Sequence, residues 1–142
     1  MKALLEAAEA ARARAHAPYS GFTVGAAVLA EDGTIHTGCN VEISSYSHTC
    51  CAERVAVFKA VSEGRTRLTA CAVVTDISPP ASPCGACRQV LNDFGPELTM
   101  YLANPAGEVI EVALAELLPK AFTPEQVLRK IKARHGGGSE QR

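Results

Sequence analysis

Apolar runs along the chain are separated by short polar stretches rich in Gly, Pro and Asp, and these runs mark the expected elements. Runs rich in Ala, Leu, Glu and Arg predict helices at residues 2–15, 51–63, 85–94 and 124–134. Shorter apolar runs bounded by turn residues predict strands at residues 24–30, 34–40, 70–75, 99–103 and 109–113. Pro18 stops the first helix, because the residue before a proline disfavours helical geometry, and Gly64 is suited to cap the second. The expected order is therefore α-β-β-α-β-α-β-β-α.

Strands that are separated by helices indicate a sheet that is covered on both faces. We therefore expect an α/β fold, a three-layer α/β/α sandwich around a mixed five-stranded sheet. Residues 1–135 are expected to form a single domain, because a chain of 142 residues is long enough for one hydrophobic core. Residues 136–142, which begin with Gly136-Gly137-Gly138, are expected to form a disordered tail.

The composition is that of an ordinary globular protein with little charge bias. Hydrophobic residues make up 47% of the chain and charged residues 20%, and the formal net charge is −1. The basic residues form no stripe, so nucleic acid is not an expected partner. No apolar run approaches the roughly 18 residues of a membrane span, and the residues after Met1 do not resemble a signal peptide. We expect a cytoplasmic protein with no membrane contact.

Six cysteines fall into two groups by their sequence context. Three belong to the short motifs Cys51-Ala52-Glu53 and Pro83-Cys84-Gly85-Ala86-Cys87. The other three lie in apolar or strand-like surroundings, and we interpret them as small buried thiols: Cys39, Cys50 and Cys71. Disulfides are not expected, because the cytosol is reducing and a chain of this length needs no covalent staples.

The two motifs predict a catalytic zinc site with Cys51, Cys84 and Cys87 as ligands. Three protein ligands leave the fourth position of a tetrahedral zinc open for water, whereas a structural zinc normally has four. Glu53 lies two residues after the first ligand, where it could move protons to and from that water. A structural zinc would need a fourth ligand from among Cys50, His48 and Cys39, none of which has finger-like spacing. A redox Cys-x-x-Cys pair is the other interpretation, but the aromatic residue that usually precedes such a pair is missing.

Both motifs stand at expected helix starts, and this position compensates the charge of the site. Zinc with three thiolates carries a formal charge of −1, which opposes the acidification of a bound water. A helix N-terminus carries about half a positive charge and stabilises thiolates placed there. Arg54 adds a full positive charge and can donate a hydrogen bond to a ligand sulfur. The alternative for Arg54 is a solvated charge on the helix surface.

The same residues resemble the small homotetrameric zinc-dependent cytidine deaminases. Cys51-Ala52-Glu53-Arg54, followed by Pro83-Cys84-Gly85-Ala86-Cys87-Arg88-Gln89, is similar to the metal motifs of that family. Other family segments are matched by Ala17-Pro18-Tyr19-Ser20-Gly21-Phe22 with Val24-Gly25-Ala26-Ala27, by Asn40-Val41-Glu42 and by Leu117-Leu118-Pro119-Lys120-Ala121-Phe122. The similarity extends from about residue 3 to residue 130, and it implies a cytidine deaminase-like sheet and helices.

The resemblance implies hydrolytic deamination of cytidine and 2′-deoxycytidine to uridine and 2′-deoxyuridine, a reaction of pyrimidine salvage. One Zn²⁺ per subunit, held by Cys51, Cys84 and Cys87, would supply a hydroxide that attacks C4 of cytosine, as in zinc deaminases generally. Glu53 would take the proton of that water, deliver it to N3 and then protonate the departing amino group, which leaves as ammonia.

The resemblance also implies the substrate contacts, which are Phe22, Asn40, Glu42, Ser45, Tyr46, Ala52 and Phe122. Asn40 and Glu42 would hold the ribose hydroxyls, because alternate residues of an extended segment point to the same side. Phe22 would pack on the pyrimidine and Tyr46 would close over the sugar, with plain core packing and loop cover as the alternatives. In the family, the residue that matches Phe122 enters a neighbouring subunit's site, which implies a homotetramer with shared active sites.

Two positions near the predicted site need separate interpretation. Ile43 stands where the family often has a polar Asn, so the loop up to Tyr46 is expected to be held differently. We interpret His48 as a loop or interface residue, because Glu53 already fills the proton-transfer role.

Three other functions compete with nucleoside deamination. A deaminase of a cytosine-containing antibiotic would share the zinc motifs, but Glu42 favours a ribose with hydroxyls to bind. Editing of RNA or DNA is disfavoured by the net charge of −1. A non-catalytic zinc module would have no use for a proton-transferring Glu53.

Overall fold

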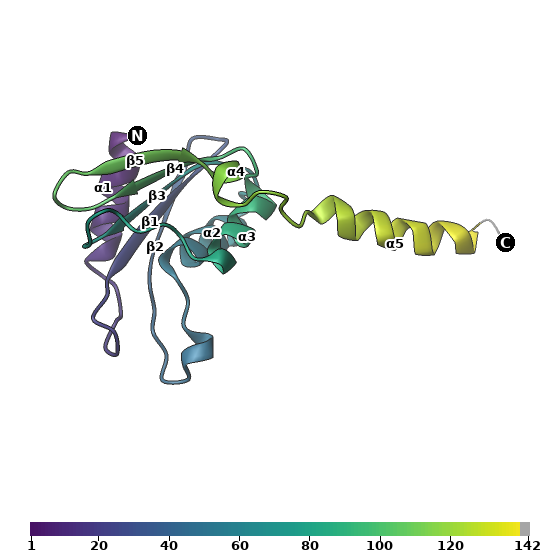
Figure 1. Cartoon of the computed structure of the whole chain (residues 1–142). Helices are drawn as coiled ribbons and strands as arrows, with labels where there is room; N and C mark the ends of the chain where they lie inside the picture. Colours follow the sequence, from purple (N-terminus) through teal and green to yellow (C-terminus); the bar gives the residue numbers. More distant parts are fainter. Residues whose placement is uncertain (140–142) are drawn as a thin grey trace.

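A computed structural model of the chain describes residues 1–139 and shows a twisted sheet between helices (Figure 1). The strands are β1 (Val24–Ala30), β2 (Ile35–Cys39), β3 (Leu68–Thr75), β4 (Thr99–Ala103) and β5 (Val109–Ala113). The helices are α1 (Lys2–Arg12), α2 (Ala52–Ser62), α3 (Gly85–Phe94), α4 (Leu114–Leu117) and α5 (Pro124–Ser139), with a short 3₁₀ helix, η1, at Tyr46–His48. None of the described helices is both long and apolar enough to cross a membrane.

The sheet has five strands in the order β2-β1-β3-β4-β5, and it is mixed, as the sequence predicts. Only β3 and β4 pair in parallel, and the other neighbours are antiparallel. Because β2 and β3 are both antiparallel to β1, they run in the same direction. Their carboxyl ends therefore lie at the same edge of the sheet, and α2 and α3 are the next regular helices along the chain after those two ends. This topology brings the two helix starts together.

Both faces of the central strands β1 and β3 are buried, which gives three layers, whereas the edge strand β5 is largely exposed. Alternate residues of β1 point to opposite sides: Ala26 and Val28 pack with α2 and α3, whereas Ala27 packs with Leu4 and Ala8 of α1. This alternation is the period of a strand whose two faces each support a helical layer. The expected α/β/α sandwich is confirmed, with α1 on one face and α2 and α3 on the other (Figure 1).

The helix α2 approaches β2 closely because Gly38 has no side chain. A Cβ at this position would lie 2.5 Å from the carbonyl oxygen of Ala52 and 2.5 Å from the amide nitrogen of Ala56. Both contacts are with backbone atoms, which cannot swing aside as a flexible side chain can. The distance between the sheet and the start of α2 is thus set by a glycine.

We expect Gly38→Ala to lower the free energy of unfolding by about 1–3 kcal/mol, the usual cost of overpacking a tight contact. Urea denaturation followed by circular dichroism measures the change. Gly136→Ala is the matched control, because a Cβ there meets no atom within 4 Å, and its midpoint should not fall. An unchanged midpoint in Gly38→Ala would contradict the tight approach.

The ends of two helices differ from the prediction by three residues or more. The helix α1 ends at Arg12 rather than at residue 15, because His16 forms an extended bridge with Val41 instead. The helix α5 continues through Ser139, although a disordered tail is expected from residue 136. Glycine lowers helix stability without removing a backbone hydrogen bond, so Gly136 does not stop the helix as a proline would. The rest of the expected tail, residues 140–142, lies outside the described residues.

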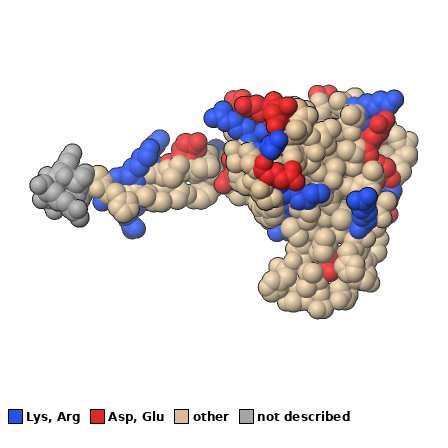
Figure 2. All heavy atoms as spheres, turned by 180° about the vertical axis from the view of Figure 1, so that it is seen from behind, with Lys and Arg blue, Asp and Glu red and all other residues tan. Residues whose placement is uncertain are grey.

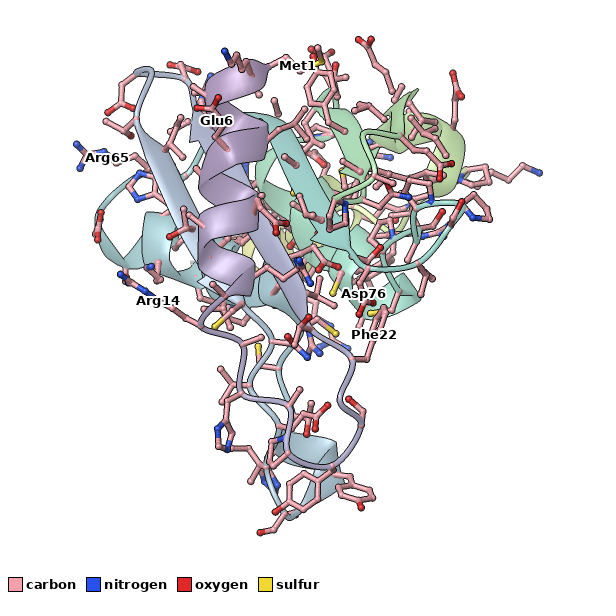
Figure 3. All side chains as sticks on the ribbon, turned by 90° about the vertical axis from the view of Figure 1, so that its left-hand side faces the viewer. Met1, Glu6, Arg14, Phe22, Arg65 and Asp76 are labelled. Carbon is pink, nitrogen blue, oxygen red and sulfur yellow. The ribbon has the colours of Figure 1, made fainter. Side chains whose placement is uncertain are left out.

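Two loops project together from the edge of the sheet where β1 begins and β2 ends. They comprise residues 17–23 and residues 42–49, and we refer to them as the protruding loops. Isolated bridges that pair Val41 with His16 and with Cys50 connect their bases. Figure 3 shows Phe22 where these loops leave the sheet, and Figure 2 shows few charged side chains on their surface. The aromatic rings of Tyr19 and Tyr46 meet between the loops at a centroid distance of 5.5 Å.

Candidate active site

The two cysteine motifs lie at helix starts and come together in space, as the sequence predicts. Cys51 is the N-cap residue of α2, Cys84 is the N-cap residue of α3, and Cys87 lies in the first turn of α3. Their three Sγ atoms lie within 4.8 Å of one another. The distance is 3.8 Å between Cys51 and Cys84, and 3.3 Å between Cys84 and Cys87.

This cluster fits a zinc ion by donor type and by spacing. Thiolates are soft ligands that favour zinc over magnesium or calcium. Sulfurs at about 2.3 Å from a tetrahedral zinc lie about 3.8 Å apart, which is close to the observed separations. Burial decreases from Cys87, which is buried, through Cys51 to the exposed Cys84, so the cluster opens toward solvent on one side. Three ligands and an open side are the features of a catalytic zinc site.

The metal-free cluster holds a thiolate because several donors converge on one sulfur. Hydrogen bonds from the Cys87 thiol, Arg54 and the Cys84 thiol lower the pKa of Cys51 to about 5, against the opposing effect of burial. The same sharing raises the pKa of Cys87, which acts as the donor to Cys51. The cluster therefore keeps one negative charge at neutral pH, and this charge favours the binding of a cation.

Arg54 contacts the cluster directly and is not a solvated surface charge. Its Nη2 donates to the Cys51 Sγ at 3.4 Å, and this hydrogen bond to Cys51 raises the pKa of its guanidinium further. Its Nε is buried without a hydrogen-bond partner, and within residues 1–139 no carboxylate forms an ion pair with this side chain. The positive charge is therefore directed at the Cys51 sulfur.

We expect Arg54→Gln to weaken zinc binding by about 10–100-fold, the usual effect of losing a group that supports a metal ligand. Without the guanidinium the pKa of Cys51 rises above about 5, so protons compete better with the metal. The difference in zinc affinity between Arg54→Gln and the unmodified protein should therefore grow as the pH falls from 8 to 6. Competition with a chromogenic chelator measures the affinity. The matched control is Arg65→Gln, which removes an exposed arginine that pairs with Asp32.

Glu53 is a buried carboxylate next to the cysteine cluster. Only 4% of its surface is exposed, although it lies in the first turn of α2 beside Cys51. Burial is the largest effect on this group and raises the pKa of Glu53, and the negative charge of Cys51 adds to the increase. A raised pKa makes it easier for a carboxylate to take up a proton that it later returns, which suits it to acid–base chemistry.

Two of the three clustered cysteines, Cys51 and Cys84, line a cavity of about 270 Å³ together with Glu53, beneath the protruding loops. Four residues implied as substrate contacts line the same cavity: Phe22, Asn40, Glu42 and Ala52. Larger hollows of about 580 and 490 Å³ lie around Arg67 and contain none of the predicted site residues. The chemistry-bearing groups therefore single out the smaller cavity.

Asn40 and Glu42 fix the first protruding loop from the cavity wall. The Asn40 Oδ1 accepts a hydrogen bond from the Val24 amide at 2.9 Å, and its Nδ2 donates to the Phe22 carbonyl at 2.7 Å. Glu42 accepts hydrogen bonds from the amides of Tyr19 and Ser20 at 3.0 and 3.1 Å, and from the Ser20 hydroxyl. These bonds lower the pKa of Glu42, which stays ionised. The two side chains thus hold the loop that carries Phe22.

The other implied contacts lie outside the zinc cavity of this single chain. Tyr46 is 71% exposed at the tip of the protruding loops, where it lines a separate hollow with Tyr19. Ser45 precedes η1, and its Oγ lies 3.0 Å from the His48 Nδ1. Phe122 is 61% exposed and precedes α5. The structure therefore does not bring these side chains to the cluster of their own subunit.

Several cavity residues are absent from the sequence prediction. Val73 and Thr75 come from β3, and Thr49, Ala81 and Ser82 come from the segments just before the two motifs. Ser82 could have been predicted as a cavity residue, because it directly precedes the motif that begins at Pro83. Val73 could not, because the sequence does not say which side of β3 faces the cavity.

The three cysteines outside the motifs do not join the cluster, and none of the six cysteines forms a disulfide. Cys71 is fully buried, as expected, but Cys39 and Cys50 are only half-buried. Burial raises the pKa of Cys50, so its thiol stays protonated beside the Cys51 thiolate. His48 is exposed and does not line the zinc cavity.

Comparison with known proteins agrees with this geometry. Residues 1–103 match the profile of the cytidine and deoxycytidylate deaminase zinc-binding region. The cytidine deaminases of Sporosarcina psychrophila and Halalkalibacterium halodurans are 53% and 50% identical over 125 residues, which cover 87% of this chain and 92% and 95% of those proteins.

Solved structures give the same result. The cytidine deaminase from Burkholderia pseudomallei is 48% identical with a TM-score of 0.83, and the match covers 85% of this chain and 98% of that chain. The cytidine deaminase from Mycobacterium tuberculosis is 43% identical with a TM-score of 0.74, and the match covers 85% of this chain and 95% of that chain. Since the matched profile spans both cysteine motifs and Glu53, and the relatives match over nearly their whole length, the chain belongs to the cytidine and deoxycytidylate deaminase family.

Proposed function

We propose that the protein is a zinc-dependent deaminase that hydrolyses cytidine and 2′-deoxycytidine to uridine and 2′-deoxyuridine. One water is consumed and one ammonia is released in each turnover. The observation that carries the proposal is the buried Glu53 beside the three-cysteine cluster, in a cavity that also contains Asn40 and Glu42. We further propose that this reaction serves pyrimidine salvage in the cytoplasm, because the substrates and products are free nucleosides.

Cys51, Cys84 and Cys87 would hold one zinc ion per subunit. The chemistry that zinc supplies when bound is the acidification of a water that can attack C4 of cytosine, as in zinc deaminases as a class. The helix starts under Cys51 and Cys84, together with Arg54, offset the negative charge of three thiolates.

Glu53 would carry the protons of the reaction. As a carboxylate it accepts the proton of the attacking water, and it then donates a proton to N3 of the ring. Glu53 would then take up the second proton of the same water, from the hydroxyl group now bonded to C4, and pass it to the amino nitrogen. The C4–N bond breaks, ammonia leaves and the C4 oxygen becomes the carbonyl of uridine. Burial raises the pKa of Glu53, which makes the protonated form a better reservoir for these transfers than a solvated carboxyl group would be.

Asn40 and Glu42 have hydrogen-bonding capacity left for a sugar while they hold the loop. A carboxylate offers about four acceptor sites, and Glu42 uses three of them for Tyr19 and Ser20. The Asn40 amide has a second N–H beside the one that it donates to Phe22. A single free acceptor on Glu42 fits a ribose and a deoxyribose alike, because the 3′-hydroxyl is present in both. Phe22 would pack on the base.

We also propose a homotetramer in which Phe122 enters a neighbouring subunit's cavity. The exposure of Phe122, and of Leu128 and Ile131 on α5, supports a contact with another chain at this end of the molecule. In Figure 1 this helix extends away from the sheet. Ser45 and Tyr46, which the chain does not bring to its own cluster, would complete the cover over the sugar.

The direct test is to mix the purified, zinc-loaded protein with cytidine and follow the absorbance change of uridine formation. Turnover of cytidine and 2′-deoxycytidine, with one zinc per chain, is the expected result. Absence of turnover with both would overturn the proposal. Parallel samples with a cytosine-containing antibiotic and with a single-stranded oligonucleotide should show no comparable activity.

We expect Phe122→Ala to raise the KM for cytidine by about 5–100-fold, since stacking of a base on an aromatic ring contributes about 1–3 kcal/mol. Steady-state kinetics measures the change, and the zinc content should stay the same. The matched control is Phe58→Ala, which removes a half-exposed phenylalanine of α2 that does not line the cavity. An unaltered KM in Phe122→Ala would contradict the shared site.

A further inference from the structure

Arg88 makes two hydrogen bonds that the proposed chemistry does not use. It follows the zinc ligand Cys87 on α3, but it does not line the zinc cavity. Its Nε donates to the Pro83 carbonyl at 2.7 Å, and its Nη1 donates to the Leu117 carbonyl at 2.8 Å. The side chain thus joins the residue before Cys84 to the last residue of α4.

Gln89, the next residue, anchors a second point of the same segment. Its Nε2 donates to the Phe122 carbonyl at 2.8 Å and to the Asp93 Oδ1 at 3.2 Å. Between the two anchored carbonyls the chain has no regular helix or strand, and Lys120 has a φ of 54°, in the left-handed region. Residues 118–122 therefore form a turn whose two ends are both tied to α3.

The arginine contact is strong for a bond between a side chain and the backbone. A guanidinium that donates to a carbonyl forms a charge-assisted hydrogen bond, and its planar fork can serve two acceptors at once. Leu117 ends α4, so its carbonyl lacks a partner within that helix and is free to accept. Among residues 1–139 Arg88 forms no ion pair, so no carboxylate competes for its donors.

We infer that Arg88 and Gln89 are positioning residues that set the direction in which Phe122 leaves the subunit. The same helix holds Cys84 and Cys87 at its start, so one rigid element connects the metal site of its own subunit with the aromatic side chain offered to the neighbour. The functional part of this inference rests on the proposed role of Phe122, whereas the structural part does not.

Fluorescence tests the structural part without any activity measurement. The sequence contains no tryptophan, so Phe122→Trp introduces a single reporter at the position of interest. In this background, Gln89→Met and Arg88→Met should each lower the steady-state anisotropy of the tryptophan, and Arg88→Lys should give an intermediate value because it keeps one charged donor. Asp93→Ala is the control, since it removes the other partner of Gln89 and leaves the Phe122 bond. Unchanged anisotropy in both Met variants, or an equal decrease in the control, overturns the inference.

Kinetics tests the functional part. Gln89→Met should raise the KM for cytidine about 5-fold, with kcat and zinc content unchanged, and should have no further effect when combined with Phe122→Ala. Effects that simply multiply in the double variant overturn the coupling between the two residues. If Phe122→Ala leaves KM unaltered, the shared site is wrong, and the anisotropy result still decides whether Gln89 and Arg88 position the residue.

Discussion

Glu53→Gln is expected to lower kcat by about 10⁴-fold, the upper end of what one positioned acid–base group contributes. The effect is large because two opposite tasks, accepting the proton of water and returning it to the base, depend on one carboxylate. The amide has nearly the same shape, so the cavity and the metal ligands should be preserved. Uridine formation measures the rate, and metal analysis measures the zinc content.

The matched control for this variant is Glu63→Gln at the other end of α2. Glu63 is exposed, and its carboxylate lies 3.1 Å from the His36 Nδ1 rather than near the cysteines. The control should retain full activity. Turnover that survives in Glu53→Gln with zinc bound would mean that another group moves the protons.

Cys84→Ser should produce the second large effect, a loss of bound zinc and, with it, of turnover. A serine hydroxyl does not ionise as a thiol does, so the site loses one of its three soft, negatively charged donors. Cys84 is the most exposed of the three ligands, so its replacement disturbs packing least. Zinc content after dialysis against a chelator, measured together with the melting temperature, separates loss of metal from loss of fold.

Cys50→Ser provides the control, because Cys50 directly precedes Cys51 but lies outside the cluster. The control should keep its zinc. Equal loss of zinc from both variants would contradict the assignment of Cys84, rather than Cys50, as a zinc ligand.

Each half of the cysteine cluster could be predicted from the sequence because its determinants are local, whereas the sheet topology brings the two halves together. Cys51 and Glu53 lie within one turn of α2, and Cys84 and Cys87 lie within one turn of α3, so helix geometry alone sets their relative positions. The strand bounds Val24–Ala30, Thr99–Ala103 and Val109–Ala113 were also predicted correctly, since clear turn residues follow or precede them.

The surroundings of the site could not be predicted, because their partners are distant in the sequence. Glu42 holds Ser20, and Arg88 reaches Leu117, contacts that no periodicity reveals. The short helix α4 was missed because four residues of Leu, Ala and Glu without a side-chain cap are too few to show a pattern. The continuation of α5 through Gly136 differs from the prediction, because a run of three glycines favours a disordered tail over a helix when only local conformational freedom is considered.

The shared direction of β2 and β3 has a consequence for how this enzyme could acquire new substrates. The three clustered cysteines are held at helix starts beside the sheet, whereas the groups proposed to recognise the nucleoside lie mainly on the protruding loops and on residues 118–122. Exchange of these loops between homologues should therefore change which cytosine compounds the enzyme accepts, while the cysteine cluster and Glu53 stay in place. In such chimaeras, the parent that supplies the sheet and helices would determine zinc binding, and the parent that supplies the loops would determine the substrate.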